Sequence, residues 1–203
     1  MVARTDENRG REAGIAVLVV EDNPTQAEGL RSLLAENGHE VVVAANGAEA
    51  LAAARRRAPR LVIIDIVMPE MDGYALCKAI KSDQTLRETP VVLLTSLASS
   101  LDVVRGLQCG ADNILRKPYD DAYLLTRLHY LLANRKLRGR EEMPIGVEME
   151  LGGQRHLITS ERQQILDLLI STYEQAVQVN DELQEREKDL RRSHQVLNGI
   201  YGI

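Results

Sequence analysis

Five polar side chains stand where short apolar runs of this sequence end, and their types suit phosphoryl chemistry. Glu21 and Asp22 follow "IAVLVV", Asp65 ends "LVIID", Thr95 ends "PVVLLT" and Lys117 follows "NILR". Three carboxylates in one place repel one another, so such a cluster normally binds a hard cation through oxygen ligands, and Mg²⁺ is the expected ion. The ammonium and the hydroxyl can then hold two oxygens of a phosphoryl group.

Asp65 is the candidate nucleophile of this cluster. A carboxylate can accept a phosphoryl group from a donor and become an aspartyl phosphate. A buried strand would present the carboxylate rigidly, and Pro69 and Gly73 in "IIDIVMPEMDG" would shape the loop beside it. The alternative, a carboxylate that only caps the next loop, is disfavoured by the polar residues at the other strand ends.

The elements that must position these residues follow from the pattern between residue 15 and about residue 136. Short apolar runs alternate there with helical stretches, which predicts an α/β fold with a five-stranded, parallel, doubly wound sheet. Pro24 indicates the first turn of one helix, and Asp72 is a plausible N-cap of another. Ligands bind outside the carboxyl ends of the strands in such sheets, so the polar cluster is expected at that edge. The strands are expected at 15–20, 40–45, 61–65, 90–95 and 113–117.

The remaining third of the chain has a different pattern. "IGVEMELGGQRHLIT" alternates apolar and polar residues around two glycines, which predicts a β-hairpin or an irregular extended arm. The following residues are charged and helical, with a leucine or alanine at every seventh position, as in a coiled coil whose register stays open. These positions are Leu169, Ala176, Leu183, Leu190 and Leu197. The predicted division is a polar tail at 1–14, a domain at 15–136, a linker at 137–159 and a coiled-coil helix at 160–203.

The stretch 15–136 resembles the receiver domain of two-component response regulators. The resemblance rests on "VVEDN", "IIDIVMPEMDG", "LLTS" and "CGADNILRKPY", which occur in the family's order. It implies a flavodoxin-like receiver fold and phosphorylation of Asp65 by a histidine kinase or a phosphotransfer protein. The Mg²⁺ ligands that it implies are Glu21, Asp22, Asp65 and the backbone carbonyl of Val67.

The resemblance also assigns parts to the other two strand ends. Thr95 would move toward the phosphoryl group, Lys117 would pair with it, and the bond from Lys117 to Pro118 is expected to be cis. Ile114 departs from the pattern, because the family often has Tyr or Phe there and uses its ring as a switch. Val67 is apolar where many relatives carry a side chain that places attacking water, so slow autodephosphorylation is expected.

The C-terminal stretch resembles the helical linkers that join receivers to GAF, PAS or histidine kinase modules. We therefore expect signal transfer through a homodimeric coiled coil to an output module that is absent from the 203 residues. The chain is interpreted as a truncated regulator or hybrid kinase, with a stand-alone dimer as the alternative.

Composition excludes several other classes of function. A net charge of -5 and 3% aromatic residues give little attraction or stacking for nucleic acid, so no direct nucleic-acid binding is expected. No apolar run reaches the roughly 18 residues of a membrane span, and Cys77 and Cys109 show no CxxC spacing. A soluble, cytoplasmic protein with reduced thiols is expected.

Two competing functions stay open at this stage. An aspartate-nucleophile phosphatase of the haloacid dehalogenase type needs DxD, but Val67 occupies the third position of that motif. A scaffold that dimerises without being phosphorylated would not need the complete set of strand-end residues. We therefore expect a phosphoacceptor domain and no enzyme beyond self-phosphorylation from a donor and slow autodephosphorylation.

Overall fold

The computed structural model describes residues 14–96, 100–135, 145–151 and 154–160, together with positions 173, 176–177, 179–180, 183–184 and 186–191. Outside these residues lie positions 1–13 of the predicted tail, positions 137–144 and the glycine pair 152–153 of the predicted linker, and most of the predicted coiled coil.

The predicted parallel sheet is confirmed. Its five strands are parallel and lie in the order β2-β1-β3-β4-β5, so the chain crosses over β1 between β2 and β3. Val20 pairs with Ala44 on one side and with Ile64 on the other, which aligns the carboxyl ends of β1, β2 and β3. The strands are β1 (Ala16–Val20), β2 (Glu40–Ala44), β3 (Leu61–Asp65), β4 (Val91–Thr95) and β5 (Asn113–Arg116).

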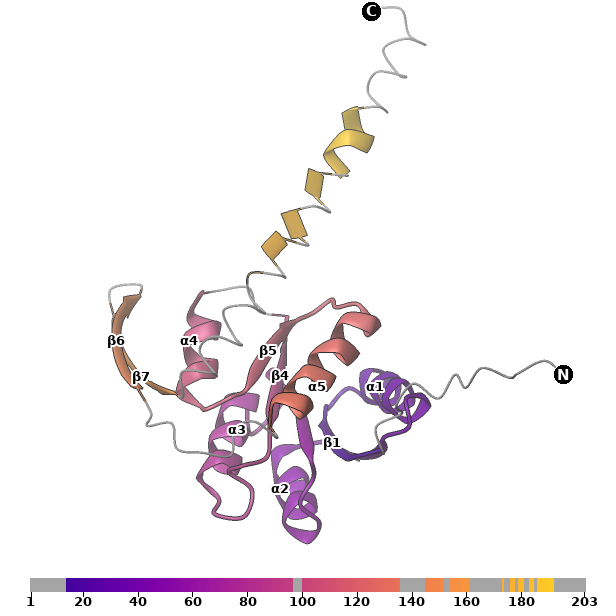
Figure 1. Ribbon diagram of the computed structural model, residues 1–203, viewed down its shortest axis with the longest axis vertical. Helices are drawn as coiled ribbons and strands as arrows, with labels where there is room; N and C mark the ends of the chain where they lie inside the picture. Colours follow the sequence, from indigo (N-terminus) through magenta and orange to yellow (C-terminus); the bar gives the residue numbers. More distant parts are fainter. Residues whose placement is uncertain are drawn as a thin grey trace, which may run out of the picture.

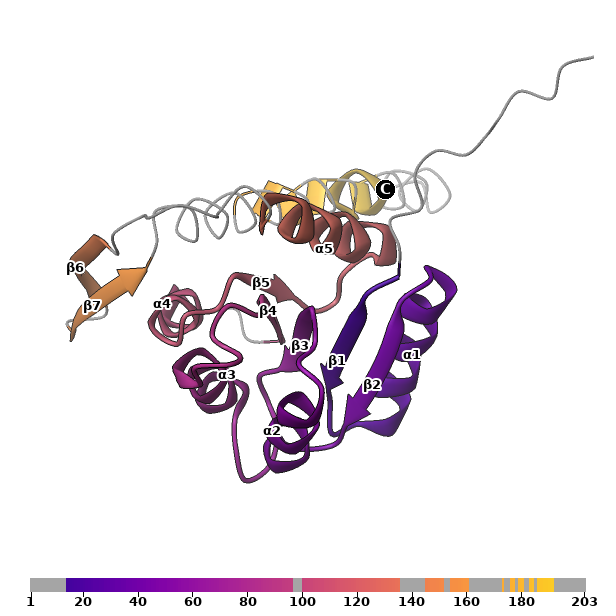
Figure 2. The ribbon, with the colours of Figure 1, turned by 60° about the horizontal axis from the view of Figure 1, so that its bottom comes forward.

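Helices cover both faces of the sheet (Figure 2). Successive strand residues point to opposite faces, so β1 contributes Val17 and Val19 to one buried cluster and Leu18 and Val20 to the other. The first cluster includes α1 and α5, and the second includes α2, α3 and α4. The helices are α1 (Pro24–Glu36), α2 (Gly47–Arg56), α3 (Gly73–Ser82), α4 (Ser100–Gln108) and α5 (Asp121–Arg135).

The helix starts carry the signals expected from the sequence. Pro24 occupies the first turn of α1, and the side chain of Asn23 accepts hydrogen bonds from the backbone amides of Thr25 and Gln26. Asp72 is the N-cap of α3 and accepts from the amide of Ala75 at 2.7 Å. These caps fix where α1 and α3 begin, immediately after the loops that follow β1 and β3.

The region after α5 forms a hairpin, as one of the two sequence interpretations predicted. β6 (Ile145–Leu151) and β7 (Gln154–Ser160) pair antiparallel, with Leu151 opposite Gln154. β7 contacts α4, and both views place the hairpin beside that helix (Figures 1 and 2). Described positions between 173 and 191 are helical. Within the described part of the chain, no helix combines the length and the apolar character needed to cross a bilayer.

Candidate phosphoacceptor site at the carboxyl ends of the strands

Three carboxylates meet where β1 and β3 end. The side chains of Glu21, Asp22 and Asp65 each offer an oxygen, and these atoms lie within 4.8 Å of one another. Glu21 and Asp65 are buried, with 2% and 8% of their surface exposed, whereas Asp22 is exposed. The crossover that makes β1 and β3 neighbours creates a topological switch point, and the cluster lies there.

Lys117 reaches the same cluster from the end of β5. Its Nζ donates to Glu21 Oε2 at 2.9 Å and to Gln26 Oε1 at 2.7 Å, and it lies 3.2 Å from Asp65 Oδ2. The ammonium therefore has three oxygen partners, two of them charged. The backbone amide of Lys117 donates to the carbonyl of Thr95 at 2.6 Å, which ties the ends of β4 and β5 together. The bond from Lys117 to Pro118 is cis, as predicted.

The loop after Asp65 folds back against its own strand. The amide of Gly73 donates to the carbonyl of Ile66 at 3.0 Å. A Cβ atom at Gly73 would lie 2.6 Å from the carbonyl oxygen of Asp65 and 2.7 Å from Cα of Ile66, so the close approach requires glycine. The side chain of Val67, two residues after Asp65, is 55% exposed. The loop thus holds Asp65 in place while leaving an apolar side chain at the mouth of the site.

The pKa of Tyr119 is raised by its burial and by the carboxylates at this edge of the sheet. Burial raises the pKa of Tyr119 to about 12, with smaller contributions from the carboxylates of Glu21, Asp121 and Asp65. A phenol near several carboxylates resists ionisation because a further negative charge would be repelled.

Most of the predicted site residues come together in the fold. Glu21, Asp22, Asp65 and Lys117 form one cluster. Thr95 is buried at the end of β4, one residue beyond Leu94, which pairs with Asp65. The sequence interpretation missed Gln26 and Tyr119. Both stand within four residues of a predicted site residue, and this spacing was the available signal.

Ile114, the aliphatic residue at the position where the family often has Tyr or Phe, is buried. Its side chain packs against α4 at Gly106, where the helix has no side chain. A Cβ atom at Gly106 would lie 2.0 Å from Cδ1 of Ile114. Asp102 anchors α4 on another side, because it accepts a hydrogen bond of 3.2 Å from the hydroxyl of Tyr74 on α3. The position of α4 thus depends on aliphatic packing against β5 and on a polar contact with α3.

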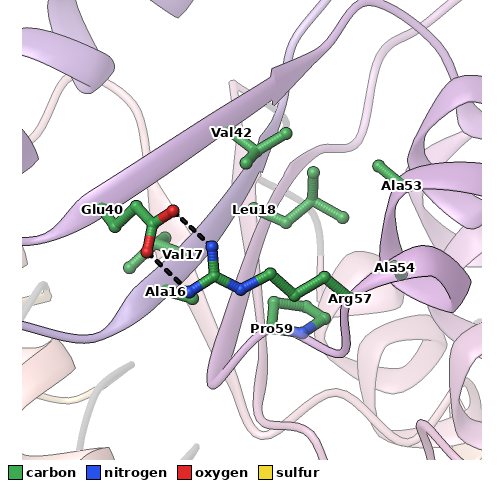
Figure 3. A pocket seen from close by; sticks show the side chains of 9 residues that line it. All are labelled: Ala16, Val17, Leu18, Glu40, Val42, Ala53, Ala54, Arg57 and Pro59. Carbon is green, nitrogen blue, oxygen red and sulfur yellow. Dashed lines mark hydrogen bonds and ion pairs between the residues drawn. The ribbon is translucent and has the colours of Figure 1, made fainter.

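A small cavity at the opposite end of the sheet is a separate feature. It lies near the first residues of β1 and β2, and its volume is about 40 Å³ (Figure 3). Arg57 spans it and donates two hydrogen bonds to the carboxylate of Glu40. Sites for small ligands usually have volumes of about 300 to 1,000 Å³, so this cavity is too small for a nucleotide. The acidic cluster stays the candidate site.

The chain belongs to the response regulator receiver domain family, whose model matches residues 17–129. This range contains the complete acidic cluster. It also contains all five strands of the parallel sheet, except for Ala16 at the start of β1. The resemblance inferred from the four motifs is therefore confirmed for the receiver. The helical linker proposed after it is not covered by the match.

Individual relatives agree with this assignment. The chain is 33% identical to the "DNA-binding response regulator MtrA" of Mycolicibacterium smegmatis over 76% of its own length and 69% of that protein. It is 40% identical to "Response regulator PleD" of Caulobacter vibrioides over 62% of its length, but it spans only 28% of that protein.

Solved structures share the fold. The receiver domain of a signal transduction histidine kinase from Syntrophus aciditrophicus has a TM-score of 0.57 and 42% identity, covering 65% of this chain and 98% of that one. The chemotaxis protein CheY4 of Vibrio cholerae has a TM-score of 0.56 and 33% identity. The match covers 58% of this chain and 98% of CheY4.

Proposed function

We propose that this chain is a phosphorylation-controlled signalling protein whose Asp65 accepts a phosphoryl group from a histidine kinase or a phosphotransfer protein. One observation carries the proposal: the Lys117 ammonium lies 3.2 Å from Asp65 Oδ2 at the edge where three carboxylates converge. This arrangement joins a nucleophilic carboxylate to a cation that can hold the charge of a transferred group.

The carboxylate cluster suits Mg²⁺. Its ligands would be the carboxylates of Glu21, Asp22 and Asp65, with the backbone carbonyl of Val67 as the fourth protein ligand. All four are hard oxygen donors, and the three side chains already lie within 4.8 Å of one another. A bound Mg²⁺ would offset the charge of the carboxylates and of the incoming phosphoryl oxygens.

The chain's own residues then define the transfer. An oxygen of Asp65 attacks the phosphorus atom, and the bond from phosphorus to the donor breaks. The donor imidazole leaves with the electron pair and takes up a proton. The Lys117 ammonium exchanges its contact with Asp65 Oδ2 for a contact with a phosphoryl oxygen. It keeps its hydrogen bond to Gln26 Oε1. Thr95 supplies its hydroxyl to a second phosphoryl oxygen.

The signal leaves the site through α4. Movement of Thr95 toward the phosphoryl group displaces α4, because α4 begins at Ser100, only five residues after Thr95. β7 contacts α4, so the hairpin is placed to receive this displacement. Ile114 takes the position of the family's aromatic switch, and we propose that aliphatic repacking at Gly106 replaces ring rotation.

The C-terminal helix supplies the dimer contact in this proposal. Leu183 and Leu190 are seven residues apart, and they are 58% and 63% exposed on a helix. Apolar side chains at this interval form a seam that a second copy of the chain would cover. We propose a tail at 1–14, a receiver at 15–136, a linker at 137–159 and a signalling helix at 160–203 in a cytoplasmic protein, with the output supplied by another module.

Intact mass spectrometry tests the transfer. The full chain is incubated with acetyl phosphate and Mg²⁺, and wild type is compared with Asp65→Asn. Asp72→Asn is the matched control, because Asp72 is an exposed helix cap close in sequence and asparagine caps equally well. We expect a gain of about 80 Da in wild type and the control, none in Asp65→Asn, and none after chelation of Mg²⁺. An equal gain in Asp65→Asn would assign the acceptor elsewhere.

Sedimentation of the same samples tests the dimer. Leu183→Glu is compared with Gln184→Glu, which adds the same charge at the neighbouring helical position. Loss of one leucine contact of about 1.5 to 3 kcal/mol should weaken the dimer at least about tenfold in the first variant only. Equal sedimentation of both variants would remove the coiled-coil part of the proposal.

The scaffold hypothesis is the second candidate function. It predicts a stable dimer and no gain of mass with acetyl phosphate in any variant. The buried positions of Glu21, Asp65 and Thr95 favour the phosphoacceptor instead, because buried polar groups are unfavourable without a compensating role.

A further inference from the structure

Two cysteine residues of the receiver are in contact, and neither has a part in phosphoryl transfer. Cys77 is on α3 and Cys109 directly follows α4, and both are buried in the same apolar cluster. Cys77 Sγ donates to the backbone carbonyl of Cys109 at 3.5 Å, and Cys109 Sγ donates to the carbonyl of Gly106 at 3.1 Å. The two residues are 32 positions apart in the sequence, and the segment between them includes all of β4 and α4.

We propose that Cys77 and Cys109 are a modification site that forms an intramolecular disulfide when the chain meets a peroxide. The chemical step does not depend on the proposed phosphoacceptor function. Its consequence for α4 does rest on that function, and the experiments below separate the two.

The surroundings distinguish the roles of the two sulfurs. The neighbouring Cys77 side chain lowers the pKa of Cys109, whereas the Cys109 side chain together with burial raises the pKa of Cys77. Lys81, one helical turn after Cys77, favours the thiolate form of both groups. Its stem packs over Gly110, and its ammonium bonds to Asp112 Oδ2 at 2.6 Å. The thiolate is the reactive form of cysteine. Because the pKa of Cys109 is lowered and that of Cys77 is raised, Cys109 reacts first.

Exposure gives the same order. Cys109 is 6% exposed and Cys77 is 0% exposed, so a small oxidant reaches Cys109 before Cys77. The Cys109 thiolate attacks one oxygen of hydrogen peroxide, the O–O bond breaks, and the leaving hydroxide takes a proton to become water. Cys77 sulfur then attacks the sulfenic sulfur, its proton leaves with the displaced hydroxide as a second water, and the disulfide forms. Two thiols and one peroxide thus give one disulfide and two waters.

The bond would join the end of α4 to α3. The amide of Cys109 bonds to the carbonyl of Arg105 at 2.9 Å, so this residue closes the last turn of α4. Tyr74 and Asp102 already connect the same two helices near the start of α4. A disulfide at the other end would fix α4 at two points and oppose the displacement that carries the signal to β7.

The test uses the full chain in its folded state. It is treated with hydrogen peroxide, free thiols are alkylated, and a peptide map is recorded without reduction. The expected result is a peptide pair linked through Cys77 and Cys109, a mass loss of about 2 Da from that pair, and recovery of both thiols after reduction. Mapping the peptides keeps this readout separate from oxidation of the five methionines.

Single substitutions test the order of attack. Cys77→Ala should leave Cys109 as a sulfenic acid that dimedone traps, whereas Cys109→Ala should leave Cys77 unmodified. Two alkylatable thiols in peroxide-treated wild type, over-oxidation of Cys109 without a link, or a link between two chains would overturn the proposal. The peptide map of wild type shows whether the disulfide forms, even if a variant fails to fold.

Phosphorylation of the oxidised chain separates the consequence from the proposed function. Asp65→Asn should form the disulfide like wild type, because Asp65 has no part in that step. Oxidised wild type should still gain about 80 Da with acetyl phosphate, but amide exchange in β7 should no longer change on phosphorylation. Absence of the mass gain in reduced wild type would count against the phosphoacceptor alone, and a change in β7 exchange that persists after oxidation would refute the restraint of α4.

Discussion

The contact between Gly106 and Ile114 predicts a specific coupling between α4 and β5. A Cβ atom at Gly106 would lie 2.0 Å from Cδ1 of Ile114 and 3.0 Å from its Cγ1, whereas Leu93 Cδ1 is at an ordinary 3.9 Å. Gly106→Ala should therefore force Ile114 out of its position. Ile114→Val removes the Cδ1 atom that makes the closest contact.

The magnitudes follow from opposing effects. Overpacking by one methyl destabilises a core by about 1 to 3 kcal/mol, and alanine in place of a helical glycine recovers about 1 kcal/mol, so Gly106→Ala should lose about 0 to 2 kcal/mol. Ile114→Val alone should lose about 0.5 to 1.5 kcal/mol. In the double variant the contact with Cδ1 is removed, and its stability should lie within about 0.5 kcal/mol of wild type.

Urea unfolding of wild type, the two single variants and the double variant gives the four free energies of this double-mutant cycle. The expected coupling energy is about 1 to 3 kcal/mol in favour of the double variant, and it equals the overpacking that Ile114→Val relieves. Additive effects within about 0.3 kcal/mol would show that Ile114 does not set the position of α4. The aliphatic replacement for the aromatic switch would then lose its structural basis.

Three further predictions concern the loop, the lifetime of the phosphoryl group and pH. Gly73→Ala should destabilise the chain by about 1 to 3 kcal/mol in urea unfolding, because its Cβ would meet the carbonyl oxygen of Asp65 at 2.6 Å, while Gly29→Ala, with no atom within 4 Å, should be neutral or stabilising. Val67→Asn should shorten the phosphoryl lifetime measured by intact mass, and a wild-type half-life of seconds would contradict the predicted slow hydrolysis. Burial lowers the pKa of His39, so the unfolded chain binds the proton more readily, and stability should fall as pH drops below about 6.5. His39→Gln should flatten that decline between pH 7.5 and pH 5.5, and an unchanged slope would assign the pH dependence to other groups.

The sequence by itself determined the local features of the fold. β1, β3 and β4 are nearly continuous apolar runs because helices cover both faces of the sheet there, and the buried residues of β3 and β4 confirm this interpretation. The polar residue at the end of each run identified Glu21, Asp22, Asp65 and Lys117 before their distances were known. Apolar runs and helix caps depend on neighbours in the sequence, so they can be recognised without the tertiary structure.

The tertiary structure alone decided how these pieces meet. The order β2-β1-β3-β4-β5 places Glu21 beside Asp65, and it brings Gln26 within 2.7 Å of Lys117 across 91 positions of the sequence. The contact of Cys77 with Cys109 and that of β7 with α4 likewise join elements far apart in the chain. Such contacts depend on strand order and on the volumes of side chains that pack from different elements, and neither quantity is written in the local pattern.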